Sequence, residues 1–285
     1  MFGNFFKTFF LLTLMACLFL FVGYLIGGEG GLIIAFLFSL IFNFFTYFFS
    51  HKIVLMSYNA KPLSEAEAPR LHAILAELSQ AAQIPKPPLY LVNNPSPNAF
   101  ATGRNPKNAV VCVTSGLTEI LNEDEIKGVL GHELGHIKNR DILLATIVAS
   151  FASAIMFLAN MAKWAAFFGG GSRDDERGGN AVGLVALLVT AILAPIAAVL
   201  IQAAISRQRE YQADATGANL AGTPIGLANA LKKLSYASKR IPLEASPATS
   251  HLFIVKPFSG QAIFNLFSTH PPIEKRIERL VGRYE

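Results

Sequence analysis

The sequence predicts a mostly helical membrane protein, in which four transmembrane helices carry a water-exposed domain with a small β-sheet. Two observations on composition support this fold class: 52% of the 285 residues are hydrophobic, and only 15% are charged. The third observation is that the apolar residues gather in a few long runs. This composition excludes a disordered chain and argues against a single soluble globule. With two cysteines, the chain has no disulfide framework.

Four apolar runs are long enough to cross a bilayer, which takes about 20 residues in a helix. We interpret the first run as a retained anchor and not as a signal peptide, because its apolar core is long and a second run follows almost at once. Pro195 lies inside the last run and predicts a kink there. The four runs are Thr8–Ile26, Leu32–Phe49, Ile142–Phe168 and Val182–Ile205.

The four spans pair into two hairpins, so the large polar segments lie on one side of the lipid bilayer. All but three of the 24 Lys and Arg residues fall on that side, the exceptions being Lys163, Arg173 and Arg177. The positive-inside rule makes this side cytoplasmic. Topology thereby accounts for the basic pI of about 9.2. We expect no nucleic-acid partner, because no recognition module is visible.

Short elements are predicted in the polar segments. Ser64 and Glu67 have the spacing of a capping box, which predicts a helix from there to about Gln83. Runs rich in β-branched residues predict strands, and clustered Pro and Ser-Pro signals predict a loop. The remaining expected elements are strands at 88–92 and 109–114, helices at 225–238 and 273–281, and a loop at 242–259.

An H-E-x-x-H motif lies at residues 132–136. On a helix, His132 and His136 lie one turn apart on the same face, so both imidazoles can bind one metal ion. Glu133 is then placed to take a proton from metal-bound water, whose pKa zinc lowers to about 7. The motif therefore predicts a hydrolytic zinc site.

The residues around this motif predict the helix that it needs. Asn122 and Glu125 have the spacing of a capping box, and acidic residues fill the first turn. Apolar residues then recur at helical spacing from Ile126 to Ile137. The alternative is a chance match of a short motif on residues that merely pack or face water. The capped, amphipathic setting disfavours it.

A catalytic zinc ion takes three protein ligands, and the residues after His136 lack the third histidine of the metzincin pattern. The best candidate is Glu210, one helical turn before Asp214. One carboxylate can bind the metal while the other accepts a hydrogen bond from a ligand histidine. Two spans separate His136 from Glu210, so both lie on the same side of the membrane. The alternative is a solvated helix face on which Arg207 or Arg209 pairs with Glu210.

These paired motifs, the flanking spans and a terminal Ser-Thr-His-Pro-Pro at Ser268–Pro272 resemble the HtpX family of integral-membrane zinc endopeptidases, which is related to the CAAX prenyl proteases. The resemblance covers essentially the whole chain. It implies a gluzincin-like zinc metallopeptidase domain made of residues 51–141 and 206–285, with one zinc ion per chain. The transmembrane hairpins are then residues 1–50 and 142–205. It also implies a bacterial inner-membrane protein with a cytoplasmic catalytic domain, acting on misfolded or membrane proteins in quality control and stress response.

The resemblance assigns roles to single residues. Asn98, Ala99 and Phe100 correspond to an edge-strand segment that pairs with an extended substrate backbone. From the residues alone, an ordinary turn containing Asn98 is the alternative. The zinc ligands are His132, His136 and Glu210, with Glu133 as general base and Asp214 as hydrogen-bond partner of a ligand.

One further candidate is His270, which could stabilise the negative charge that develops on the carbonyl oxygen during hydrolysis. The alternative is that Thr269 or His270 caps the final helix, with proline at its first position. Arg207 and Arg209 are other candidates for contacting substrate carbonyls, and the sequence offers no way to choose among them.

Three other functions compete with this interpretation. An intramembrane site-2-type protease would carry the motif inside a span, but Lys127, Lys138 and the acidic cluster at 123–125 make that helix too polar for lipid. A non-catalytic scaffold or chaperone is disfavoured by the intact Glu133. A transporter needs polar groups deep in its spans, and few are found there.

Overall fold

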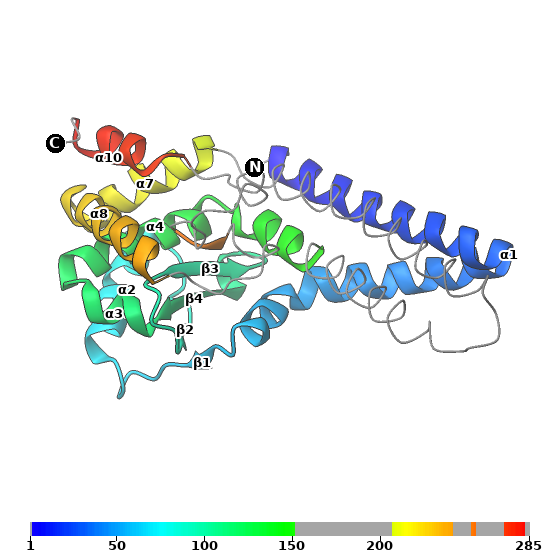
Figure 1. Cartoon of the computed structure of the whole chain (residues 1–285), viewed down its shortest axis with the longest axis horizontal. Helices are drawn as coiled ribbons and strands as arrows, with labels where there is room; N and C mark the ends of the chain where they lie inside the picture. Colours follow the sequence, from blue (N-terminus) through cyan, green and yellow to red (C-terminus); the bar gives the residue numbers. More distant parts are fainter. Residues whose placement is uncertain (1, 152–206, 242–251, 255–270, 283–285) are drawn as a thin grey trace.

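The structure, a computed structural model, describes residues 2–151, 207–241, 252–254 and 271–282. A rounded domain of helices and one sheet carries a long helical hairpin that projects from it (Figure 1). Of the third expected span, residues 142–151 are described and form a helix. The rest of that span and the whole of the fourth lie outside the described residues.

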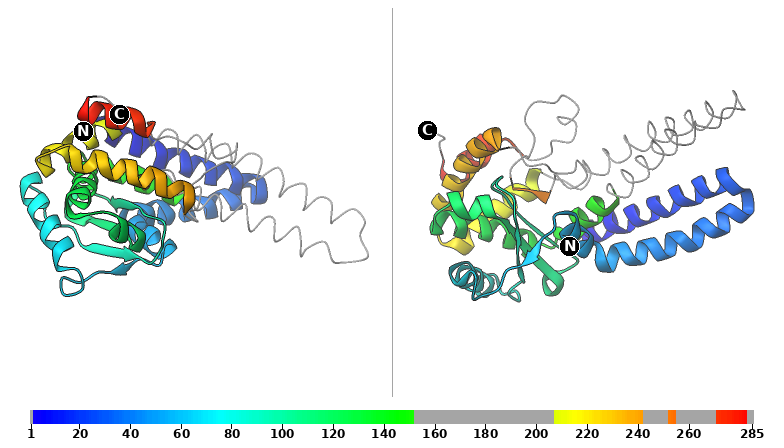
Figure 2. Two further views of the ribbon diagram at one scale, coloured as in Figure 1. Left: turned by 60° about the vertical axis from the view of Figure 1, so that its left-hand side comes forward. Right: turned by 60° about the horizontal axis from the view of Figure 1, so that its bottom comes forward.

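The projecting hairpin is α1 (Phe2–Ser57), which is interrupted at Gly27 and Gly28. Gly28 has φ +56° and ψ −137°, a conformation that residues with a side chain rarely adopt, and the chain reverses there. The two halves run side by side in every view (Figures 1 and 2). Across them, the Asn43 side-chain amide donates a hydrogen bond to the Leu12 carbonyl at 3.2 Å. The first two expected spans are therefore paired as a hairpin.

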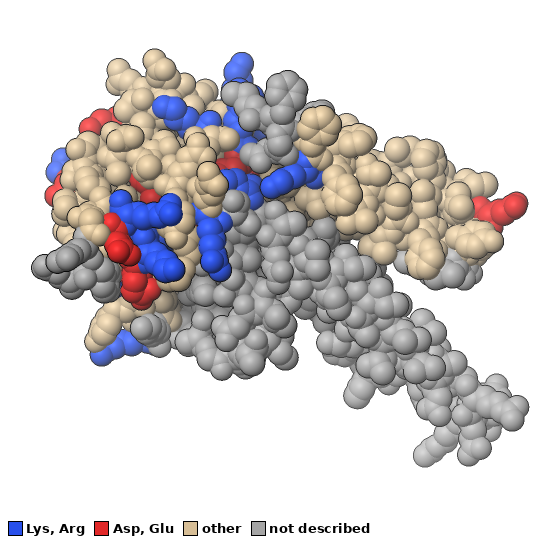
Figure 3. Space-filling model, turned by 90° about the horizontal axis from the view of Figure 1, so that it is seen from above, with Lys and Arg blue, Asp and Glu red and all other residues tan. Residues whose placement is uncertain are grey.

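The hairpin presents an apolar surface. Among the described residues, one helix is long and apolar enough to cross a bilayer, namely Gly27–Ser57, which continues past the expected end of the second span at Phe49. Phe6–Phe21 and Ile142–Phe151 are shorter apolar helices. Only 17% of the most apolar window of Gly27–Ser57 is buried. Figure 3 shows no charged groups on the visible hairpin surface between the domain and its acidic tip. An exposed apolar surface of this size fits contact with lipid.

The domain contains a four-stranded mixed sheet in the order β1-β2-β4-β3. β2 pairs parallel to β4, while β1 and β3 run antiparallel to their neighbours. The two strands predicted from β-branched runs are confirmed, and the segment between them forms β3 at the sheet edge, as expected. The strands are β1 (Lys61–Pro62), β2 (Leu89–Val92), β3 (Ala99–Gly103) and β4 (Ala109–Thr114).

Among the described residues, two hydrophobic clusters pack against this sheet. The larger one joins β3 and β4 to the helices of the domain, with Leu130 and Leu134 fully buried. The smaller one joins the sheet to the end of the hairpin through Val54 and Leu55. In it, the rings of Tyr58, Phe100 and Phe253 lie 5.3–5.7 Å apart between centroids. The hairpin is thus packed against the domain and not merely tethered to it.

The described helices of the domain follow the expected pattern, with two corrections at helix starts. α2 begins at Pro69 and not at Ser64, because Ser64 and Glu67 hydrogen-bond each other in a turn before the helix. The final helix begins as expected at Ile273, but Pro272 takes the N-cap position without a side-chain cap bond. Besides the short helix η1 (Pro106–Asn108), the helices are α2 (Pro69–Ala82), α3 (Ser115–Ile120), α4 (Glu123–Lys138), α7 (Arg207–Ala221), α8 (Ile225–Arg240) and α10 (Ile273–Val281).

The helix that carries the H-E-x-x-H motif, α4, lies within the domain, against the sheet, α7 and α8 (Figure 1). This packing within the folded domain argues against the intramembrane alternative for the motif. Glycines allow α4 and α7 to approach closely. A Cβ atom on Gly217 would lie 2.6 Å from the His132 backbone nitrogen, and one on Gly131 would lie 2.8 Å from the Gly217 carbonyl oxygen. This contact brings the first turns of α7 beside the motif.

We predict that Gly217→Ala destabilises the protein, although alanine favours helix more than glycine does. The added methyl group meets backbone atoms of α4 that cannot move aside cheaply. Overpacking of this kind costs about 1–3 kcal/mol. Thermal unfolding of the purified protein should show a lowered midpoint. Asn219→Ala, at an exposed position of the same helix, is the control and should leave the midpoint unchanged or slightly raised. Equal midpoints for Gly217→Ala and wild type would contradict the tight contact.

Candidate metal centre

The first two parts of the site come from α4, whose start is fixed by a complete capping box between Asn122 and Glu125, as predicted. The apolar positions of α4 are buried in the core, so the helix is held in one rotation about its axis. His132 and His136 then lie on one face, with their Nε2 atoms 3.1 Å apart. The spacing of the motif therefore produces the paired imidazoles that the sequence analysis expected.

The third part comes from α7. The Glu210 carboxylate oxygens lie 3.9 Å from His132 Nε2 and 3.5 Å from His136 Nε2. One ligand atom from each of the three residues lies within 4.8 Å of the others. Tetrahedral zinc holds nitrogen and oxygen ligands at about 2.0–2.2 Å, so two ligand atoms lie roughly 3.3 Å apart. The three side chains fit a zinc ion in number, chemistry and spacing.

Each histidine of the pair also contacts a buried carboxylate through its other ring nitrogen. Asp214 Oδ1 lies 2.9 Å from His132 Nδ1, and Asp141 Oδ2 lies 3.1 Å from His136 Nδ1. A carboxylate at Nδ1 fixes the tautomer and leaves Nε2 free to bind a metal. Sequence reasoning anticipated Asp214 in this position. It assigned no role to Asp141, which directly precedes the third expected span.

Asp214 is itself bound by a buried arginine that sequence reasoning missed. Arg276 of α10 is 0% exposed, and its Nε and Nη2 atoms donate hydrogen bonds to Asp214 at 2.9 and 2.6 Å. Burial alone would raise the pKa of Asp214, but the guanidinium outweighs it and lowers that pKa to about 2. Arg276 and Ile277 are both buried on one face of α10. A charged residue next to the apolar position of this helix was the signal in the sequence that could have revealed Arg276.

The two imidazoles differ in how readily they bind a proton. Burial lowers the pKa of His132. Burial also acts against protonation of His136, but the negative charges of Asp141, Glu210 and Glu133 prevail and raise its pKa to about 10. A metal ion binds the neutral imidazole. Metal binding at His136 would therefore require the loss of this proton, and the carboxylates that favour the imidazolium would favour the metal cation in the same way.

The side chain of Glu133 is buried between its own helix, α4, and the edge strand β3. Its side chain is shielded from water, and this burial is the main reason that its pKa rises to about 7; Glu210 adds to the rise. The charge of His136 and a hydrogen bond with the Ala101 backbone act in the opposite direction. A carboxyl group with a pKa near 7 can both accept and donate a proton at neutral pH. Its place beside the histidine pair suits the base that the motif predicts.

The segment expected to bind substrate is buried at the sheet edge. Ala99 and Phe100 are 0% and 1% exposed. The Ile254 N–H donates a hydrogen bond to Asn98 Oδ1 at 3.1 Å and approaches the Ala99 carbonyl oxygen at 3.4 Å. Residues 252–254 therefore lie along part of the outer edge of β3. The substrate-binding role of Asn98–Phe100 stays a prediction.

The remaining candidates are placed as follows. His270 lies outside the described residues. Arg207 is exposed at the start of α7. Arg209 is partly buried, and its positive charge lies near Asp141 and Glu210. Of the two arginines, Arg209 is the one that the structure brings to the site.

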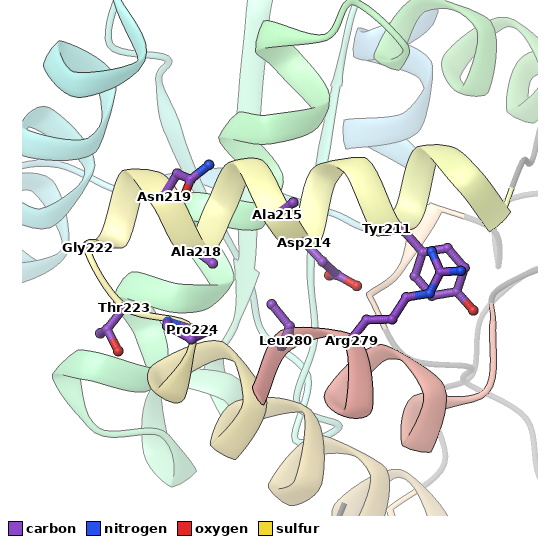
Figure 4. Close-up of a pocket in the computed structure, with 10 residues that line it drawn as sticks. All are labelled: Tyr211, Asp214, Ala215, Ala218, Asn219, Gly222, Thr223, Pro224, Arg279 and Leu280. Atoms are coloured by element: carbon purple, nitrogen blue, oxygen red, sulfur yellow. The ribbon is translucent and has the colours of Figure 1, made fainter. Parts of the chain in front are cut away.

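A separate cavity of about 680 Å³ opens between α7, the start of α8 and α10 (Figure 4). It reaches Asp214 but none of the three residues that converge for a metal. At one end of it, the Arg279 guanidinium lies 3.8 Å from the centre of the Tyr211 ring. The lining residues are Tyr211, Asp214, Ala215, Ala218, Asn219, Gly222, Thr223, Pro224, Arg279 and Leu280. Asp214 is the point at which this cavity touches the surroundings of the metal centre.

Comparison with known proteins gives a consistent result. Residues 65–284 match the family described as peptidase family M48. A protease HtpX homolog of Syntrophobacter fumaroxidans is 56% identical, over 98% of this chain and 99% of that protein. One of Thermococcus kodakarensis is 55% identical, over 96% and 94% of the two chains.

Among solved structures, the crystal structure of S. mikatae Ste24p is similar in fold. The TM-score is 0.50 at 17% identity, and the match covers 98% of this chain and 66% of that one. The family match over most of the sequence, with relatives more than half identical along its length, shows that the chain belongs to peptidase family M48, the zinc metallopeptidases, as a homologue of protease HtpX.

Proposed function

We propose that this M48 metallopeptidase is a membrane-anchored endopeptidase that hydrolyses misfolded or membrane proteins at the cytoplasmic face of a bacterial inner membrane. The observation that carries the proposal is the convergence of His132, His136 and Glu210, with Glu133 beside them. His132, His136 and Glu210 would hold one zinc ion per chain. When bound, zinc polarises the peptide carbonyl and lowers the pKa of water.

The protein's own groups perform the proton transfers. Ionised Glu133 accepts a proton from the attacking water and later donates it to the leaving amine. Asp214 holds His132 in the tautomer that presents Nε2, and Arg276 keeps Asp214 ionised. The burial of these groups excludes bulk water and strengthens each electrostatic contact. His270 or Arg209 would stabilise the developing oxyanion.

The substrate would bind as an extended strand. β3 lies at the sheet edge, and Ala99 at its start packs in the same hydrophobic cluster as residues of α4. Pairing through main-chain groups is largely independent of sequence, which suits unfolded substrates of many kinds. A substrate strand at this edge would have to share or replace the contact that Ile254 makes with Asn98.

The membrane topology that we propose has four spans in two hairpins, residues 1–50 and 142–205. The catalytic domain is then made of residues 51–141 and 206–285. The paired halves of α1 and the apolar helix at 142–151 support the two hairpins. The excess of Lys and Arg in the large segments supports a cytoplasmic catalytic domain. The relatives are protease HtpX homologs, and a role in membrane protein quality control under stress is what the resemblance to the HtpX family implies.

We predict that Glu133→Gln abolishes proteolysis while leaving about one zinc ion per chain. The amide cannot accept the proton from water, and loss of a general base costs about 10²–10⁴-fold in rate. Casein cleavage by detergent-purified protein and zinc content would be measured together. Glu123→Gln, at an exposed position of the same helix that pairs with Arg70, is the control and should retain both. Retained cleavage, or loss of zinc in Glu133→Gln, would disprove the role assigned to Glu133.

We also predict an acid limb in the pH profile of kcat/KM. Glu133 must be ionised to accept a proton, so activity should fall as pH decreases through its pKa. That pKa is raised to about 7 by burial, and the positive charge of zinc lowers it, so the midpoint should lie at or below pH 7. Zinc content measured at each pH separates this titration from metal loss. A profile that stays flat or rises towards acid pH, with zinc retained, would count against this mechanism.

A further inference from the structure

The turn that follows α4 directs the carboxylate of Asp141 back towards the metal centre. The Arg140 N–H donates to the Ile137 carbonyl at 3.2 Å, and the Asp141 N–H donates to the His136 carbonyl at 3.3 Å. These two bonds form a Schellman motif, in which the residue after the helix adopts a left-handed conformation. Arg140 has φ +57°, although glycine is the usual residue there. The turn places the Asp141 carboxylate beside Nδ1 of the His136 ring.

The resulting contact matches the one on the other histidine. Asp141 is 5% exposed, and its Oδ2 atom lies 3.1 Å from His136 Nδ1. Asp214 lies 2.9 Å from His132 Nδ1 and is 3% exposed. With both Nδ1 atoms engaged, the two rings lie at 89° to each other and meet at their Nε2 atoms. Carboxylates from two different elements thus orient the pair.

The turn is held in place from its far side as well. Residues 142–151 continue from Asp141 as the helix that starts the third expected span. In that helix, Thr146 Oγ1 lies 3.0 Å from Thr102 Oγ1 and accepts a hydrogen bond from the Gly103 N–H at 3.3 Å. Asp141 therefore lies between two anchored elements, α4 and a helix pinned to β3.

We propose that Asp141 is a positioning residue for metal binding: it accepts the Nδ1–H of His136 and keeps Nε2 directed at the metal. This inference rests on the proposed zinc site and extends it to a residue outside the H-E-x-x-H motif. The competing explanation is that Asp141 only caps the helix at 142–151. A capping side chain would accept a backbone N–H of that helix. Among the described residues, Asp141 Oδ1 has no hydrogen-bond partner and Oδ2 contacts His136.

The test is the rate at which zinc leaves the full-length, detergent-solubilised protein for a chromogenic chelator. Removing the partner of a metal-bound histidine typically costs 10–100-fold in metal affinity. Asp141→Ala should therefore release zinc about 10–100-fold faster than wild type. Asp141→Asn retains an acceptor without the charge and should be faster than wild type by a smaller factor. This partial rescue is not expected of a residue that acts only through general stability.

Two control variants separate positioning from loss of structure. Arg140→Gly keeps the turn and the carboxylate, and Leu75→Ala truncates a core residue of α2 away from the site. Both should release zinc at the wild-type rate, the second despite a lowered unfolding temperature. If Asp141→Ala and Asp141→Asn also release zinc at the wild-type rate, the inference is overturned while the proposed function stands. If wild-type protein binds no zinc, the proposed function itself fails.

Discussion

The architecture depends on one close contact, the glycine-lined approach of α7 to α4. Gly131 and Gly217 lack side chains at the point where the two backbones meet. Only because the helices come this close can Glu210 reach the histidine pair, from a position in the sequence beyond the third and fourth expected spans. The metal centre is thus assembled from two parts of the chain that flank the second expected hairpin. The same contact would hold the two halves of the site together across the proposed second hairpin.

The second constraint is the handling of buried charge. A metal centre made of buried carboxylates and imidazoles is unfavourable unless each charged group has a partner. Here Asp214 is paired with Arg276 and His132, and Asp141 is paired with His136. Arg276 also donates a hydrogen bond to the Ile254 carbonyl at 2.9 Å, and Ile254 in turn contacts the edge of β3. The C-terminal helix therefore joins the metal centre to the expected substrate edge.

Local signals in the sequence were sufficient for α4, because its capping box and apolar spacing lie within sixteen residues. Glu210 could be predicted as well, since an even number of spans returns the chain to the same face. Arg276, Asp141 and Ile254 could not, because their contacts depend on tertiary packing or on the geometry of a single turn. Ser64 shows the opposite case: its capping bonds with Glu67 form as predicted, but they close a turn, and the helix starts later at Pro69.

The central claim is that two imidazoles of one helix and a carboxylate from α7 bind the same zinc ion. X-ray absorption at the zinc edge of the purified, full-length protein tests it most directly. The account predicts nitrogen and oxygen neighbours only, at about 2.0–2.1 Å, with scattering from two imidazole rings and one fewer oxygen ligand in Glu210→Ala. Sulfur neighbours at about 2.3 Å, or a zinc environment that Glu210→Ala leaves unchanged, would contradict it.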